Sequence, residues 1–310
     1  MLIAKARRLI DLVHDIRARL ERVQEALGRI ELRQTAAHDG PGLQGAEFRV
    51  FSQWGEDGII QRLLLEVSVE RKLFVEFGVQ DYTEANTRFL LVNDNWYGLV
   101  MDGDAAHIAT VRRDPVYWRY NLKAERAFVD RDNVNDLIRG NGIEGDIGLL
   151  SIDIDGNDYW VWKAITCVRP RILVLEYNAL FGPRAAVTVP YDPTFFRTRA
   201  HYSNLFWGAS LEALTRLSRD KGYILVGCNN AGNNAFYVRA DLRGRLEEKS
   251  VESAFVQAQF RESRDAAGLP TYLDLAAGRL LIEDEELWDI DANSLVPVRT
   301  ALEGILRHAE

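Results

Sequence analysis

The chain has few of the residues that are typical of disulfide-stabilised or nucleic-acid-binding proteins. Only two cysteines, Cys167 and Cys228, occur in 310 residues. They are too few for a disulfide scaffold and lack the spacing of a thiolate metal site. The formal net charge of −8 argues against a nucleic-acid phosphate backbone as the main ligand. We therefore expect a cytoplasmic protein with no nucleic-acid partner.

The chain also lacks a long, uninterrupted apolar run. Charged residues interrupt the apolar ones near its start (Lys5, Arg7, Arg8 and Asp11), which argues against a signal-peptide core or a spanning helix there. No later segment is long and apolar enough to cross a bilayer. Hydrophobic residues nevertheless make up 47% of the chain, enough for a sizeable core. We expect no transmembrane segment and one large domain with appendages.

Residues 1–34 carry a regular heptad pattern. Their apolar residues recur in alternating steps of four and three: Leu2, Ala6, Leu9, Val13, Ile16, Leu20, Val23, Leu27 and Ile30. This spacing predicts a coiled-coil helix that joins copies of the chain into a homo-oligomer, and leucine at a with β-branched residues at d favours more than two strands. Two alternatives stay open: the helix packs on its own domain, or it lies on a membrane surface, which its acidic residues disfavour.

Two further segments differ in composition from the central domain. Residues 35–47 contain Gly40, Pro41, Gly42 and Gly45 and predict a flexible linker. Residues 241–310 show helical patterns around 251–261 and 298–306, so we expect a helical C-terminal extension. We interpret its acidic run, residues 283–291, as a solvated face.

The central part begins with a β-α-β unit. Residues 73–78 and 97–102 predict strands, and residues 86–92 between them have helical spacing. Asp102, at the end of the second strand, is placed to bind ribose hydroxyls. The glycine-rich G-x-G-x-x-G motif is absent, because Gly78 stands alone, which disfavours a dinucleotide. A ribose-containing cofactor without phosphates remains.

The sheet continues with two buried strands and a hairpin. Residues 148–153 and 171–176 are apolar runs typical of inner parallel strands, and residues 160–168 predict the crossover helix, ended by Pro170. The strands predicted at 223–228 and 234–239 are joined by too short a connection to be parallel. We expect an α/β fold, a Rossmann-like class I methyltransferase sheet that is mostly parallel with an antiparallel last strand.

Five short blocks resemble the FkbM-like family of S-adenosylmethionine-dependent methyltransferases, over residues 48–240. The blocks are Ser52-Gln-Trp-Gly-Glu-Asp57, Phe74-Val-Glu-Phe-Gly78 with Asn86-Thr87, Ile152-Asp-Ile-Asp-Gly156, Gly208-Ala-Ser-Leu211 and Gly222-Tyr223. The resemblance implies that S-adenosyl-L-methionine is the cofactor. It implies cofactor contacts at Glu76, Gly78, Asn86, Asp102 and Asp153, with adenine near Ala124 and Glu125. The family has Glu where this chain has Asp155.

Oxygen-bearing side chains end the two inner strands. Asp153 follows one, while Glu176 and Asn178 follow the other and point to the same side because they are two residues apart. These are hard ligands of the kind that Mg²⁺ binds. The set is similar to the metal site of catechol O-methyltransferase, except that Tyr177 separates the second pair. We expect a divalent cation here; the alternative is a metal-free site with Asp153 or Asp155 as the base.

The catalytic base has two candidates, Asp155 and His201. An alcohol needs its proton removed before it attacks a methyl group, and His201 has the more suitable ordinary pKa. Asp155, Asn157 and Asp158 also precede the predicted helix, so some of them are expected to be helix caps.

The long loop 179–207 combines aromatic residues with arginines and is expected to bind substrate. Guanidinium groups and aromatic faces suit a sugar that carries a carboxylate or phosphate. The predicted substrate-binding residues are Gln53, Arg184, Tyr191, Arg197 and Arg199.

The predicted function is O-methylation of a sugar hydroxyl by residues 48–240, on an acidic or phosphorylated saccharide of a surface polysaccharide or secondary metabolite. One alternative is an O-methyltransferase of a small non-sugar hydroxyl compound. Another is a non-catalytic scaffold whose coiled coil organises glycan assembly.

Overall fold

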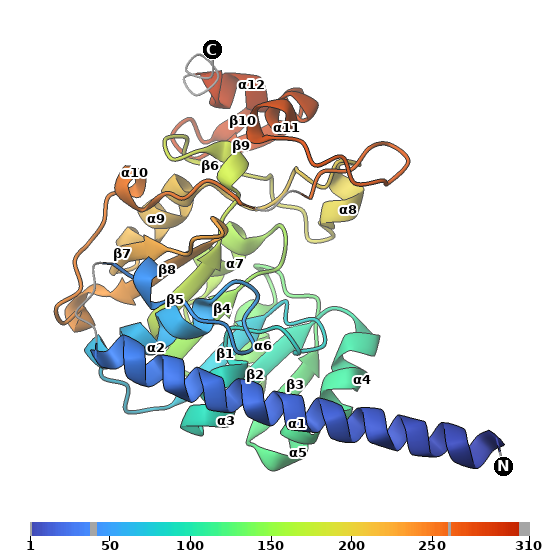
Figure 1. Ribbon diagram of the computed structural model, residues 1–310. Helices are drawn as coiled ribbons and strands as arrows, with labels where there is room; N and C mark the ends of the chain where they lie inside the picture. The colour runs from blue at the N-terminus through green and yellow to red at the C-terminus, as the bar shows by residue number, and fades with distance from the viewer. Residues whose placement is uncertain (1, 38–41, 260–261, 304–310) are drawn as a thin grey trace.

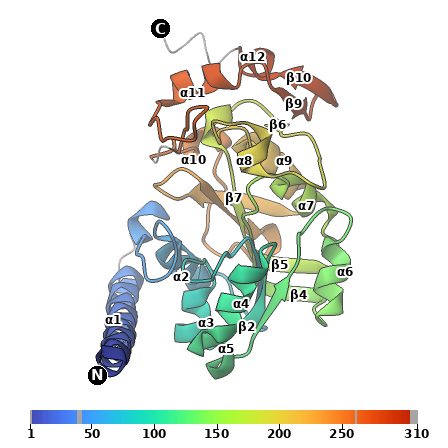
Figure 2. The same cartoon turned by 90° about the vertical axis from the view of Figure 1, so that its right-hand side faces the viewer.

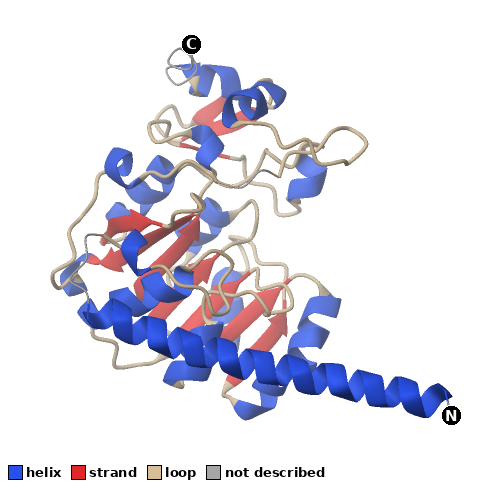
Figure 3. Cartoon of the chain, in the orientation of Figure 1, coloured by secondary structure: helices blue, strands red, loops and turns tan. Residues whose placement is uncertain are grey.

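The computed structural model describes residues 2–37, 42–259 and 262–303. Its centre is a seven-stranded sheet in the order β3-β2-β1-β4-β5-β8-β7 (Figures 1 and 3). β8 is antiparallel to both its neighbours, and the other adjacent pairs are parallel, which confirms the predicted sheet. The strands are β1 (Leu73–Phe77), β2 (Tyr97–Asp102), β3 (Leu122–Arg126), β4 (Gly145–Ile152), β5 (Val168–Glu176), β7 (Tyr223–Cys228) and β8 (Asn234–Arg239).

Side chains of the strands alternate between two hydrophobic cores, one on each face of the sheet. In β1, Leu73, Val75 and Phe77 enter one core and Phe74 enters the other. Helices close both cores, as expected for inner parallel strands. The core that contains Phe74 is covered by α2 (Glu56–Glu66), α3 (Arg88–Asp94), α4 (Ala105–Arg113) and α5 (Pro115–Arg119). The other is covered by α6 (Val134–Gly140), α7 (Asp158–Ala164), α9 (Leu211–Asp220) and α10 (Val251–Ala254).

Two details of the sheet differ from the sequence prediction. Strand β3 was not among the predicted strands, because at this sheet edge its sequence, Leu-Lys-Ala-Glu-Arg, is largely polar. The crossover helix α7 ends at Ala164, ahead of the predicted end at 168. Pro170 does not end it but lies in β5, opposite Ile147. Proline is tolerated near the first residues of a strand, where few ladder hydrogen bonds are lost.

Helix α1 (Leu2–Ala37) lies along the side of the domain near α2 and α3, and its N-terminal half extends beyond it (Figures 1 and 2). It continues past the predicted boundary at 34. Residues 38–41 of the predicted linker lie outside the described residues, but Leu43 and Ala46, around the short helix η1 (Gln44–Ala46), are buried. That part of the predicted linker is therefore packed onto the domain. No helix in the described ranges has the length and apolar character needed to span a membrane.

The C-terminal extension contains strands as well as helices, which corrects the wholly helical prediction. β9 pairs with β10 and with β6 from the long loop, which gives a three-stranded sheet. Leu287, in the acidic run, is fully buried. The predicted helix at 251–261 is only the four-residue α10, and residues 260–261 and 304–306 lie outside the described part. The remaining elements are η2 (Ala179–Phe181), β6 (Val187–Thr188), α8 (Arg197–Ala200), η3 (Ala240–Leu242), α11 (Leu275–Leu281), β9 (Glu286–Asp289), β10 (Ser294–Pro297) and α12 (Val298–Ala301).

Candidate active site

The loop after β1 contains a glycine that a larger residue could not replace. Gly78 has a φ of +76°, and a Cβ built on it would lie 1.6 Å from the backbone oxygen of Asp153. Only glycine combines this conformation with such a close approach. The Gly78 amide also donates to the backbone oxygen of Met101 at 2.9 Å. The ends of β1, β2 and β4 therefore meet at this glycine, in the region where open α/β sheets bind ligands.

Glu76 is buried at the end of β1 and is held by the start of the next helix. One carboxylate oxygen accepts from the Asn86 backbone amide at 2.8 Å; the other accepts from the Thr87 amide at 3.1 Å and its hydroxyl at 2.5 Å. Burial raises the pKa of Glu76 to about 7 even so. The Asn86 side chain donates to the Ser151 hydroxyl at 3.1 Å. These bonds fix β1, β4 and the segment before α3 around one carboxylate.

Asp102 orders the second strand end. Its carboxylate accepts from the backbone amides of Gln80 and Asp104, both at 2.8 Å, and lies 3.1 Å from Nδ1 of His107. Its side chain is still 11% exposed, toward a cleft. A carboxylate in this position can accept further hydrogen bonds from ligand hydroxyls.

Two clefts lie on either side of Gly78. The Asp102 cleft, of about 640 Å³, is lined by residues that include Asp102, His107, Phe128 and Phe195. The Glu76 cleft, of about 440 Å³, is lined by residues that include Glu76, Asn86, Gln53 and Gln24. Both include Gly78, Gln80 and Asp153 in their walls. One elongated ligand could therefore occupy both clefts across Gly78.

Glu125, expected near an adenine, is not among the residues that line either cleft. Its carboxylate instead accepts a hydrogen bond from the Asn141 side chain. The Asp102 cleft is lined by residues 126–129, directly after β3. Glu125 therefore precedes the cleft wall in the chain, and its role in binding adenine stays a prediction.

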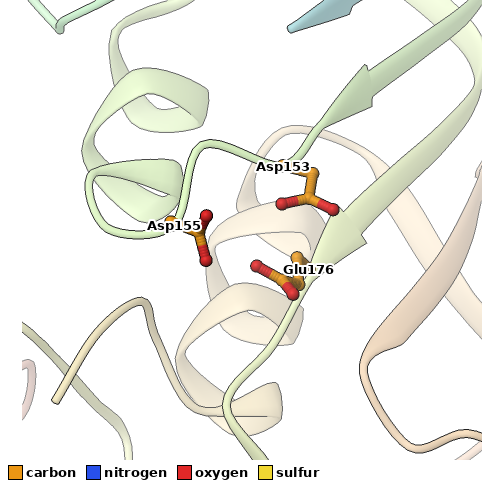
Figure 4. A group of neighbouring side chains, drawn as sticks. All are labelled: Asp153, Asp155 and Glu176. Atoms are coloured by element: carbon orange, nitrogen blue, oxygen red, sulfur yellow. The ribbon is translucent and has the colours of Figure 1, made fainter. Parts of the chain in front are cut away.

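Three carboxylates converge beside the clefts. Asp153 follows β4, Asp155 lies in the next loop, and Glu176 ends the adjacent β5 (Figure 4). One oxygen of each lies within 4.8 Å of the others. Glu176 Oε2 is buried and has no hydrogen-bond partner among the described residues. A buried polar atom without a partner is costly, so this group of oxygens fits a bound cation or a ligand hydroxyl.

Two carboxylates of this group, Asp153 and Glu176, have raised pKa values. Burial and the mutual repulsion of the acids raise the pKa of Asp153 and of Glu176 well above their ordinary values. A cation placed among the three oxygens would relieve that repulsion.

Arg197, predicted to bind substrate, forms an ion pair with Asp155 of this group. Its Nη1 donates to Asp155 at 2.7 Å, Nη2 donates to Glu262, and Nε donates to the backbone oxygen of Asn204 at 2.8 Å. The guanidinium also lies 4.6 Å from the centre of the Trp207 ring. Arg197 therefore neutralises part of the acidic charge of the group.

The loop that carries Asp155 is held in place by a buried acid. Asp158, predicted to cap the helix, accepts from the backbone amides of Ile154 and Gly156, each at 2.9 Å. Burial raises its pKa to about 6. Asp155 itself has a φ of +56°, a left-handed conformation that aspartate tolerates better than most residues. Its side chain is 49% exposed and points toward the other two carboxylates (Figure 4).

Asn178 and His201 lie outside the carboxylate group. Asn178 Oδ1 accepts from the Leu180 amide at 3.0 Å, and its Nδ2 donates to the backbone oxygens of Leu205 and Trp207. Asn178 is therefore a cap for η2, and its role as a metal ligand stays a prediction. His201 Nδ1 lies 2.7 Å from the Ser203 hydroxyl, and His201 is not among the residues that line the Asp102 cleft or the Glu76 cleft.

A third cleft, of about 500 Å³, adjoins the carboxylates. This Arg197 cleft shares Phe128, Ile154, Asp155, Phe195 and Phe196 with the Asp102 cleft. Its other walls include Arg197, Glu262, Arg264 and Tyr272. Phe196 and Tyr272 are exposed, at 49% and 62%. The cleft therefore offers aromatic faces directly beside Asp155.

The other predicted substrate residues are scattered. Gln53 lines the Glu76 cleft. Tyr191 donates to Asp132 at 2.9 Å and lines a separate cleft with Trp160. Arg184 and Arg199 are exposed and are not among the residues that line the Arg197 cleft. Sequence reasoning missed Phe128, Glu262 and Tyr272, which are distant in the chain and have no local pattern that would reveal them.

The comparisons with known proteins concern the arrangement of the sheet. No family model matches the chain, and no curated protein matches it. Solved structures resemble it in part. Its strand order with antiparallel β8 agrees with the α/β sheet that the sequence predicted.

Three of these solved structures illustrate the likeness. An S-adenosylmethionine-dependent methyltransferase from Clostridium acetobutylicum has a TM-score of 0.37 and 10% identity, covering 59% of this chain and 88% of its own. The N-terminal domain of EvdMO1 with S-adenosylhomocysteine bound has a TM-score of 0.41 and 11% identity, covering 71% and 97%. An O-methyltransferase from Bacillus cereus in complex with S-adenosylhomocysteine has a TM-score of 0.34 and 13% identity, covering 68% of this chain and 89% of its own. Similarity at this level says nothing about substrate or mechanism.

Proposed function

We propose that this protein is an S-adenosylmethionine-dependent O-methyltransferase of the FkbM-like type. The observation that carries the proposal is the junction at Gly78, where two clefts meet beside three carboxylates. The cofactor's methionine part would lie in the Glu76 cleft and its ribose on Asp102. Adenine would lie against residues 126–129 rather than at Glu125. The sulfonium methyl group of S-adenosylmethionine would then be near Asp153.

A divalent cation fits the carboxylate group. Asp153, Asp155 and Glu176 supply three oxygen ligands, and Glu176 Oε2 lacks another partner within the described ranges. Mg²⁺ prefers such hard ligands and keeps waters in its remaining positions. When bound, the cation would lower the pKa of a substrate hydroxyl and orient it.

The chain's own residues would complete the reaction. Transfer of the methyl group to a hydroxyl forms a carbon–oxygen bond, breaks the carbon–sulfur bond and releases the hydroxyl proton. In the metal-free alternative, Asp155 would accept that proton, because it is half-exposed beside both the Asp102 and Arg197 clefts. Arg197 would hold Asp155 in position.

A saccharide acceptor is supported by the Arg197 cleft. Exposed Phe196 and Tyr272 offer flat faces against which a sugar ring can pack, and Arg264 is an exposed cation for a carboxylate or phosphate substituent. A small non-sugar hydroxyl compound would use the same cleft and stays the alternative. The two cysteines are free and buried, which is compatible with the predicted cytoplasmic location.

Calorimetric titration with S-adenosylhomocysteine tests the proposal. We expect saturable binding to the wild-type protein, and absence of binding would overturn the methyltransferase and favour the scaffold hypothesis. A panel of nucleotide sugars, glycan fragments and small hydroxyl compounds would then be incubated with S-adenosylmethionine and Mg²⁺. A mass increase of one methyl group identifies the acceptor class.

The heptad residues of α1 support a homo-oligomer. Seven of them form an exposed stripe, which we call the seam: Leu9, Val13, Ile16, Leu20, Val23, Leu27 and Ile30, each 46–63% exposed. A row of exposed apolar residues at a and d positions is typical of a helix that pairs with another copy. We expect Leu20→Lys to lower the mass seen in light scattering to that of one chain, while Arg22→Ala on the same helix leaves it unchanged.

A further inference from the structure

Helix α1 has a second contact face, separate from the seam. Glu21 pairs with Arg88 of α3 at 2.7 Å, and the Gln24 side chain donates to the backbone oxygen of Val50. Gly28 is buried in the same interface. Since residues 21, 24 and 28 lie on one side of a helix and the seam lies on another, both faces can be occupied at once.

Gly28 allows this face to approach the domain. A Cβ added at Gly28 would lie 2.4 Å from Val50 Cγ2 and 3.2 Å from the Phe89 ring. Leu32, one turn further on, packs on a small core of Phe48, Val50, Phe51 and Phe89. Glycine is unfavourable inside a helix, so its presence at the contact indicates a need for close packing rather than for helix stability.

The docked face leads directly to the Glu76 cleft. Gln24 lines that cleft together with Val50, Phe51, Glu76 and Asn86. Helix α1 therefore contributes a residue to the wall of the cleft.

A second connection runs through α3. Arg88 is 3% exposed and donates to Glu21 of α1, to the backbone oxygen of Tyr82 and to Asp114. It directly follows Thr87, which binds the carboxylate of Glu76. The ion pair with α1 thus fixes the residue next to the one that holds Glu76.

We propose that docking of α1 completes the cofactor site, so that the helix and S-adenosylmethionine stabilise each other's binding. The inference rests on the proposed function. Gln24 is a positioning residue that holds the loop of Val50, and the pair of Glu21 with Arg88 positions the segment that holds Glu76. The helix that joins copies of the chain through its seam would also set the affinity for cofactor.

A wedge at Gly28 tests the inference. Gly28→Leu introduces a side chain where Val50 leaves no room, while Ala26→Leu adds the same side chain at an exposed position of α1. Leucine favours helix, so neither variant should unwind α1. We expect the Kd for S-adenosylhomocysteine to rise at least about tenfold in Gly28→Leu, equal to about 1.4 kcal/mol, and to stay unchanged in Ala26→Leu.

The outcomes separate this inference from the proposed function. Wild-type protein that binds no S-adenosylhomocysteine overturns both. Wild-type binding with an unchanged Kd in Gly28→Leu overturns the inference alone, provided that circular dichroism shows both variants folded.

A measurement on the wild-type protein decides the case in which Gly28→Leu does not fold. Because coupling of two binding events is reciprocal, cofactor must also hold α1 on the domain. Hydrogen exchange of backbone amides in residues 21–32 should slow when S-adenosylhomocysteine is saturating, while residues 9–16, beyond the domain, should exchange at an unchanged rate. Equal exchange of residues 21–32 with and without ligand overturns the inference.

Discussion

Two sets of buried acids in this protein differ in what surrounds them. Asp57 Oδ2 accepts from the backbone amides of Val50, Phe51 and Ser52 at 2.7–2.8 Å, and from the Ser52 hydroxyl. Asp153 and Glu176 face each other and Asp155 instead. Both sets have raised pKa values because of burial, so the pKa alone does not distinguish them. The hydrogen-bond partners do.

This difference in partners distinguishes acids that stabilise the fold from acids that form a candidate site. An acid that accepts hydrogen bonds from several backbone amides satisfies donors that would otherwise be buried without a partner. It therefore stabilises the local conformation of the main chain. Acids that repel one another and leave Glu176 Oε2 without a partner in the described part of the chain destabilise the fold. Such an arrangement is expected where a ligand supplies the missing positive charge.

The largest expected effect concerns the structural acid. Asp57→Ala should lower the free energy of unfolding by about 4 kcal/mol, because it leaves three buried amides without an acceptor at about 1–3 kcal/mol each. Urea denaturation measures this. Asp57→Asn is the matched control and should lose less, since Oδ2 accepts all four bonds and Oδ1 has no partner within the described residues. Equal losses in the two variants would contradict the assignment.

The opposite sign is expected for the acids proposed to bind a cation. Glu176→Gln and Asp153→Asn should raise the free energy of unfolding of the metal-free protein by about 1 kcal/mol, because each removes repulsion within the group. Both should abolish calorimetrically detected binding of Mn²⁺ or Mg²⁺. A variant that unfolds as readily as Asp57→Ala would show that the carboxylate is structural after all.

The pH dependence of stability should sharpen the contrast. The pKa values of Asp57, Glu76 and Asp158 are raised to about 6, 7 and 6, so their folded forms bind protons more tightly than their unfolded forms. Stability with chelator present should therefore increase as pH falls from about 8 to 5. Thermal unfolding midpoints measure this. Glu176→Gln, with one raised acid fewer, should give a shallower slope; a midpoint that falls over this range would refute the sign.

The smallest effect on stability is expected at Asp155. Asp155→Asn keeps a residue that tolerates the left-handed backbone, and the side chain is half-exposed, so the free energy of unfolding should change by less than about 0.5 kcal/mol. The affinity of the Asp155→Asn protein for Mn²⁺ should nevertheless fall about tenfold, because a charged ligand is lost. Calorimetry and urea denaturation measure the two effects. Unchanged affinity would remove Asp155 from the ligand set.

The sequence determined the sheet because its local patterns agree with the global fold. The apolar runs that became β1, β2, β4 and β5 each fit only a strand buried on both faces, and the short hairpin connection required β8 to be antiparallel. Strand β3 was not predicted, because an edge strand needs fewer apolar residues than an inner strand. The small sheet of β6, β9 and β10 escaped because its strands are short and come from segments about a hundred residues apart.

At the candidate site, the sequence identified which strand ends carry acids, and the tertiary structure decided how they are used. Asp153 and Glu176 converge because parallel neighbouring strands end at one edge. Asp155 lies beside them on a backbone with a positive φ, and Asn178 donates to backbone oxygens of a distant loop; no local pattern encodes either feature. The heptad spacing likewise predicted the seam of α1, but its second contact face was found only from its packing against Val50 and Phe89. Periodic burial is a local property of the chain, whereas hydrogen-bond partners between distant segments exist only once the chain has folded.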